Sequence, residues 1–250
     1  MATLQSLMFI GMVFETIIII IATFLLLLIL KRYFVKKHRL TFYLFIIFLN
    51  WLLAIIFSWL SKVLVLYSGL DYLAAGTTHD PRTPLSWILF RIIDFRISFM
   101  FVTIGTTFSY ILMLNVFDRE FSKNQKTLIY IYGIFTAFYS LIIYQRGVTI
   151  LDVFAFLFLL ILISIVYIPF MISSFKYYKS VSDPEYKKAF LSLALMSLSF
   201  ILVLLMFLID RILILFGDPG FTIFYFMAWT FVIIGFLEAY LGYIKPKSKG

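Results

Sequence analysis

The chain has 250 residues, of which 64% are hydrophobic and only 13% are charged. A soluble domain of this size needs far more polar residues to cover its surface, so the composition excludes the ordinary soluble classes. The net charge of +9 does not indicate a nucleic-acid partner, because the basic residues concentrate in a few loops.

Seven apolar segments of roughly 20 residues or more follow one another, and each predicts a transmembrane helix. We expect a single all-α integral membrane domain over residues 1–250, a seven-transmembrane-helix bundle embedded in a lipid bilayer. The helices are expected at about residues 7–30, 41–67, 85–117, 127–144, 149–175, 189–216 and 221–244. The only long connection, residues 68–84, is rich in Gly, Asp and Pro and reads as a loop.

The positions of Lys and Arg give the expected orientation. Four regions that share one side of a seven-helix bundle carry most of the basic residues: residues 31–39, 119–126, 176–188 and 245–249. The positive-inside rule therefore predicts a multi-pass protein of the cell membrane, with its N-terminus outside and its C-terminus in the cytoplasm.

Two stretches indicate a possible internal repeat. Residues 59–67 and 208–216 align so that Lys62 lies opposite Arg211, each followed by four aliphatic residues and one aromatic residue. This pattern suggests a 3+1+3 pseudo-repeat, in which helices one to three are duplicated as five to seven. Alternatively, two outward-running helices rich in Ile and Leu resemble each other without duplication.

Eight ionisable residues fall in the outer halves of the expected helices or near the membrane midplane. Each costs about 2.5–3.5 kcal/mol at a helix centre unless it is paired or hydrated. They are Glu15, Lys62, Arg91, Asp94, Arg96, Asp152, Asp210 and Arg211.

This set contains as many acids as bases. Arg91 and Asp94 are three residues apart and can pair locally. Arg96 points elsewhere and needs a partner from another helix, for which Glu15, Asp152 and Asp210 are the candidates. The set predicts an outward-facing charged pocket that binds a small polar ligand or a proton. The alternative is that the ion pairs only determine helix register and packing.

Two further polar residues lie in the inner half. Glu238 and Asn115 are candidates for coupling the pocket to the cytoplasmic face. Alternatively, Glu238 meets the interface or a basic residue such as Lys31 or Arg32, and Asn115 makes an interhelical hydrogen bond.

The residues and motifs that metal, haem, nucleotide-binding and hydrolase sites require are missing from the expected helices. The chain has no cysteine, and its two histidines, His38 and His79, are both in loops, so no metal or haem site is expected inside the membrane. No P-loop, GxGxxG or GxSxG motif occurs. We therefore expect no cofactor and no enzyme.

The general plan resembles several seven-helix families. It is similar to microbial rhodopsins, but residues 221–244 contain no lysine for a retinal Schiff base. The tripeptide Asp118-Arg119-Glu120 resembles the DRY-type signature of G-protein-coupled receptors, and the 3+1+3 plan is similar to SWEET sugar transporters. The chain most resembles the seven-helix sensor modules of prokaryotic signalling proteins, especially small stand-alone archaeal ones, through the exit Leu241-Gly-Tyr-Ile-Lys-Pro-Lys247.

The resemblance to sensor modules implies a role in signal transduction. The leading hypothesis is a non-enzymatic receptor or sensor whose basic cytoplasmic loops contact a signalling partner. One alternative is a transporter or channel for a small solute, an ion or protons, built on the 3+1+3 repeat. Another is a structural subunit of a membrane complex. A continuous polar path from the pocket to Glu238 and Asn115 would favour transport, and an apolar plug would favour a receptor.

Overall fold

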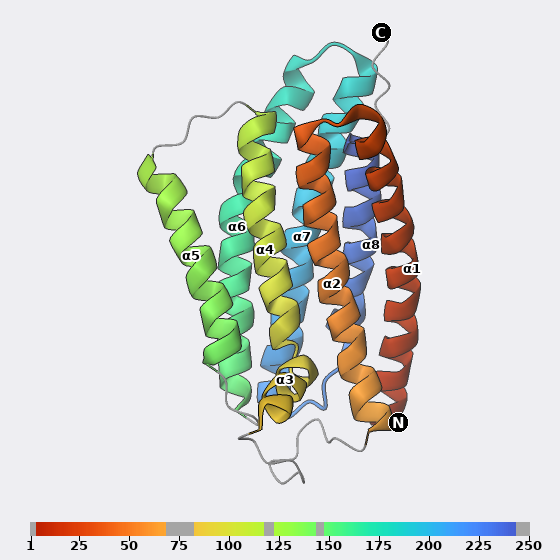
Figure 1. Ribbon diagram of the computed structural model, residues 1–250, viewed down its shortest axis with the longest axis vertical. Helices are drawn as coiled ribbons and strands as arrows, with labels where there is room; N and C mark the ends of the chain where they lie inside the picture. The colour runs from red at the N-terminus through yellow and green to blue at the C-terminus, as the bar shows by residue number, and fades with distance from the viewer. Residues whose placement is uncertain (1–3, 69–82, 118–122, 144–147, 244–250) are drawn as a thin grey trace.

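A computed structural model describes residues 4–68, 83–117, 123–143 and 148–243, and this part of the chain is all-helical (Figure 1). The helices are α1 (Leu4–Lys36), α2 (Arg39–Tyr67), α3 (Pro84–Ile93), α4 (Arg96–Val116), α5 (Lys123–Ile142), α6 (Thr149–Ser180), α7 (Pro184–Leu215) and α8 (Ile223–Tyr243). The expected all-α class is confirmed.

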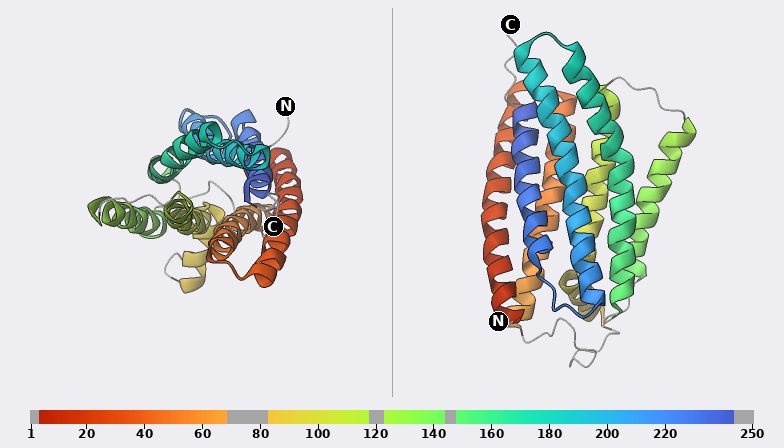
Figure 2. Two further views of the ribbon diagram at one scale, coloured as in Figure 1. Left: turned by 90° about the horizontal axis from the view of Figure 1, so that it is seen from above. Right: turned by 180° about the vertical axis from the view of Figure 1, so that it is seen from behind.

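The helices form a closed ring (Figure 2, left). Helix α1 packs on α2, α2 on α4, α4 on α6, α6 on α7, α7 on α8, and α8 returns to α1. The short α3 lies at the end of the bundle near the N-terminus, and α5 runs along the outside of α4 and α6 (Figure 1). The core of the protein therefore lies between six helices, with α5 at the periphery.

Six helices, α1, α2, α4, α6, α7 and α8, are long and apolar enough to cross a bilayer. They expose large apolar side chains on the outside of the ring, among them Ile20, Phe24 and Leu27 of α1. Helix α5 has 20 residues and also exposes apolar side chains such as Leu128 and Ile134, but its first turn is polar and begins at Lys123. A multi-pass membrane protein explains this surface, because apolar side chains of this size favour lipid over water.

The third expected segment is not one helix, and the prediction of a continuous helix over 85–117 is wrong. Helix α3 ends at Ile93, and α4 begins at Arg96 after Phe95, which adopts the left-handed conformation with φ 61°. The Ser61 hydroxyl of α2 donates a hydrogen bond of 2.6 Å to the Ile93 carbonyl, which the break leaves without an intrahelical partner. A non-glycine residue in this conformation costs about 1–3 kcal/mol, so the surrounding contacts must hold it there.

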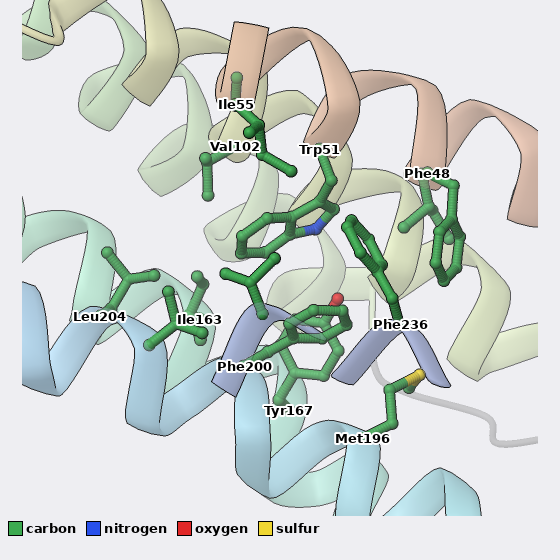
Figure 3. Packing of buried hydrophobic residues seen from close by; sticks show 14 of the residues in the cluster. Phe48, Trp51, Ile55, Val102, Ile163, Tyr167, Met196, Phe200, Leu204 and Phe236 are labelled. Atoms are coloured by element: carbon green, nitrogen blue, oxygen red, sulfur yellow. The ribbon is translucent and has the colours of Figure 1, made fainter. Parts of the chain in front are cut away.

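An aromatic layer crosses the middle of the ring (Figure 3). We call it the aromatic plug and define it as Phe48, Trp51, Tyr167, Phe200 and Phe236, all of them buried. The rings of Trp51 and Phe200 stack with centroids 4.6 Å apart, and those of Phe48 and Phe236 lie 4.9 Å apart. The plug joins α2, α6, α7 and α8 in one packed layer.

Candidate functional site

A buried ion pair joins α1 to α2. The Lys62 ammonium lies 2.8 Å from Glu15 Oε1, and both side chains are almost fully buried, with exposed fractions of 1% and 0%. Two hydroxyls donate to the same carboxylate oxygen: Ser58 of α2 at 2.9 Å and Tyr225 of α8 at 2.7 Å. Glu15 Oε1 is thus the meeting point of three helices.

The second carboxylate oxygen differs from the first. Within the described part of the chain, Glu15 Oε2 is buried and has no hydrogen-bond partner. An unsatisfied oxygen on a buried carboxylate is costly, and native structures rarely retain one without a functional reason or a bound water. The Glu15–Lys62 pair is therefore incompletely compensated by its protein neighbours.

Phe95 sits between two of the cations. Its ring centroid lies 4.8 Å from Lys62 Nζ and 5.0 Å from the Arg211 guanidinium carbon, which are cation–π distances. The left-handed backbone at Phe95 thus places the ring where basic residues of α2 and α7 both contact it. Lys62 also lies 5.3 Å from the Tyr225 ring, so aromatic faces partly replace the water that this ammonium would otherwise bind.

A second ion pair joins α4 to α6. Arg96 Nη2 donates to Asp152 Oδ1 at 2.6 Å, with Arg96 fully buried and the Asp152 side chain one-quarter exposed. Asp152 is the partner that Arg96 finds among the three expected candidates. Arg211 also lies within electrostatic range of Asp152, so the two ion pairs belong to one electrostatic network.

Asp210 stabilises the turn between α7 and α8. Its Oδ1 atom accepts hydrogen bonds from the Thr222 backbone N–H at 2.9 Å and from the Thr222 hydroxyl at 2.7 Å. Asp210 is buried beside Arg211, and it lies within electrostatic range of Lys62. Asp210 therefore organises the start of α8, the helix that carries Tyr225.

Arg91 and Asp94 occupy the end of α3. Arg91 stacks on Trp87 at 3.7 Å and donates to the carbonyls of Trp87 and, on α5, Leu141. Asp94 is half-buried and forms the C-cap of α3, where its backbone N–H donates to the Phe90 carbonyl at 3.0 Å. Arg91 thus connects α3 to α5, and the expected Arg91–Asp94 pair stays a prediction.

A cavity of about 60 Å³ lies inside the ring next to these groups. Its lining comes from α2, α4, α6, α7 and α8 and is mostly aromatic and aliphatic, with Phe95 at the helix break. Ser58, Ser98, Arg211 and Tyr225 supply polar atoms to the wall. By the rule that a water needs about 10–15 Å³ of such volume, the cavity has room for a few waters or for a ligand of a few heavy atoms.

The half of the bundle that contains Asn115 and Glu238 has no comparable site in the described residues. Asn115 is exposed, and its side chain donates to the Ile111 carbonyl of its own helix at 2.7 Å. The carbonyl four residues earlier accepts this bond within the same helix, so the interhelical bond expected for Asn115 stays a prediction. Glu238 is half-buried on α8, where the plug residue Phe236 precedes it and separates it in sequence from the cavity-lining Val232.

Sequence reasoning missed Ser58, Phe95, Ser98 and Tyr225. Ser58 had a usable signal, since it lies four residues before Lys62 and so shares its helix face. Phe95 had none, because neither Gly nor Pro marks the break. Tyr225 is separated from Glu15 by 210 positions, which no periodicity connects.

Some expectations fall on residues outside the described ranges. These are the long loop over 69–82, the tripeptide Asp118-Arg119-Glu120 and the basic exit after Tyr243. No family model matches the chain, and comparisons with curated proteins and with solved structures find no similar protein.

Proposed function

We propose that the protein is a non-enzymatic seven-transmembrane receptor or sensor of the cell membrane. In this proposal α3 and α4 together form the third span, and α5 forms the fourth. The basic ends of α1, α5, α6 and α7 face the cytoplasm, where they contact a signalling partner. The network around Glu15, Lys62, Arg96 and Asp152 faces outward and detects a small polar ligand or a proton.

One observation carries the proposal: a costly buried charge network lies above a packed aromatic layer. Replacing a buried ion pair by apolar residues is often neutral or stabilising, so structure alone gives little reason to keep the Glu15–Lys62 pair. The aromatic plug contains no charged residue and has Phe200 and Phe236 at its centre. Charge changes at the network therefore reach the other end of the bundle through helix movement, as in a receptor.

The contacts of Glu15 between helices suit a change of helix packing in response to a change of charge. Glu15 Oε1 holds α1, α2 and α8 together, so protonation or loss of the carboxylate charge weakens three contacts at once. The two states then differ in the packing of α1 against α2 and α8, and a ligand favours one of them by its differential affinity.

The test uses the absence of cysteine from the chain. Spin labels on Arg39→Cys at the start of α2 and Ser180→Cys at the end of α6 report the separation of the two halves at the basic end. We expect the isosteric Glu15→Gln to shift the distribution of distances between the two labels, as measured by double electron–electron resonance in nanodiscs. Asp218→Asn, which neutralises an exposed acid outside the network, is the matched control and is expected to leave it unchanged. An unchanged distribution in Glu15→Gln refutes the proposal.

A transporter remains the second candidate, because a specific contact pattern favours it. Exchanging α1, α2 and α4 with α6, α7 and α8 maps each helix contact of the ring onto another one. The exchange also relates Glu15, which contacts α8, to Asp152, which contacts α4. Lys62 and Arg211 then occupy equivalent places on either side of Phe95. These relations support the 3+1+3 repeat, a design found in transporters.

Proteoliposomes separate the two candidates. A receptor with a closed plug leaves an imposed proton gradient as stable as in protein-free vesicles. If the wild-type protein dissipates the gradient and Glu15→Gln does not, the receptor is refuted in favour of a proton-coupled transporter.

A further inference from the structure

The described residues that line the cavity carry a single charged group. Among the described residues that line it, Arg211 alone has a formal charge, and no carboxylate takes part. Ser98 also lines the cavity; its side chain is 6% exposed, and its hydroxyl has no hydrogen-bond partner within the described residues. A buried hydroxyl without a partner in a cavity wall is explained by a water or a ligand in that cavity.

The helix break adds backbone donors at the same place. Helix α4 begins at Arg96, so the amides of its first turn have no carbonyl four residues earlier to bind. Its N-cap, Phe95, makes no side-chain capping bond, and the first backbone bond across the cap runs from the Phe99 N–H to the Phe95 carbonyl. The positive end of the helix dipole therefore lies at the Phe95 and Ser98 end of the cavity wall, which favours a negative charge there.

The remaining wall is apolar and the volume is small. Val102, Leu159 and Leu204 line the cavity beyond Ser98. About 60 Å³ corresponds to roughly four to six water-sized spheres, the size of a molecule with a few heavy atoms. These walls thus suit an occupant with one anionic end and a short apolar end. An Arg guanidinium binds a carboxylate with two parallel hydrogen bonds, which a halide cannot make.

We propose that this cavity binds a short-chain monocarboxylate of about acetate to butyrate size. Its carboxylate contacts Arg211, the Ser98 hydroxyl and the first turn of α4, and its alkyl group lies on the apolar wall. This inference rests on the proposed receptor function, for which it names the class of ligand.

The test is a titration of the purified full-length protein in nanodiscs at constant sodium concentration, with gluconate replaced by propionate. Trp51 and Trp229 line the cavity, so tryptophan fluorescence reports its occupancy. We expect a saturable fluorescence change and a rise in unfolding temperature with propionate, and neither with propionamide, its uncharged analogue. Equal effects of the two compounds overturn the proposal.

Two serines provide matched variants. Ser98→Ala removes the unpartnered hydroxyl from the cavity and is expected to weaken propionate binding about tenfold, since a hydrogen bond to a charged group is lost. Ser174 also carries a buried hydroxyl without a partner in the described residues, but it does not line the cavity. Ser174→Ala is expected to bind like the wild type, and a similar loss in both variants overturns the site.

Further arms identify the anion and separate the two proposals. Chloride that saturates the same Ser98-dependent signal overturns the assignment to a carboxylate. If propionate fails while Glu15→Gln still shifts the Arg39–Ser180 distance, the ligand class is wrong and the receptor stands. If propionate binds and the Arg39–Ser180 distance is unchanged in Glu15→Gln, the site stands and the receptor is refuted.

Discussion

Removal of Lys62 from the buried Glu15–Lys62 pair is expected to destabilise the protein more than removal of the Glu15 charge. Lys62→Met leaves a carboxylate that is 0% exposed and whose remaining donors, within the described helices, are the Ser58 and Tyr225 hydroxyls. Breaking a buried pair in this way costs about 3–5 kcal/mol, because a buried charge remains uncompensated. Glu15→Gln costs less, about 1–3 kcal/mol, since Lys62 keeps the Ser58 carbonyl and the aromatic rings around it.

The double variant decides whether the two residues act as a pair. Glu15→Gln with Lys62→Met removes both charges, so we expect a loss well below the sum of the single losses, with a coupling energy of about 2–3 kcal/mol. Reversible unfolding of the four proteins in mixed micelles measures the free energy of unfolding of each. Additive losses refute the reasoning, because they show that neither residue depends on the charge of the other.

Three further predictions follow from the same contacts. The corresponding cycle of Arg96→Met and Asp152→Asn should give a coupling of about 1 kcal/mol in the same unfolding assay, because water screens the partly exposed Asp152; a coupling above that of the first pair contradicts this order. Phe95→Gly should be more stable than Phe95→Ala by about 1 kcal/mol, since only Gly adopts a φ of 61° without strain, and equal melting temperatures contradict it. Gly235→Ala should lose about 1–3 kcal/mol in thermal unfolding, since a Cβ there lies 2.9 Å from the Phe200 ring; a wild-type melting temperature contradicts the tight contact.

Sequence positions identify the charged residues of the candidate site but not their partners. The cost of burying a charge in lipid singles out Glu15, Lys62, Arg96 and Asp152, and this reasoning needs only their positions in apolar segments. Spacing could not choose the partner of Arg96 among three acids on other helices. Asp152 takes that place because α6 packs directly on α4.

The helix break at Phe95 could not be predicted from the local sequence. Nothing in the local sequence favours a left-handed residue there, and a continuous helix is the better prediction from propensity. The break forms in the structure with Ser61 donating to the freed Ile93 carbonyl and two cations over the Phe95 ring. These compensating contacts come from α2 and α7, which are distant in sequence.

The amino-acid sequence alone determined the all-helical class and the membrane environment, because each apolar run must satisfy its own backbone groups when no water is available. It also placed the ionisable residues, since burial in lipid is costly wherever the helix packs. Only the tertiary structure decided which charges meet, where the third segment breaks and that a cavity opens beside Ser98. These features depend on side chains that approach one another across helices, such as Glu15 and Tyr225, and no local pattern encodes that approach.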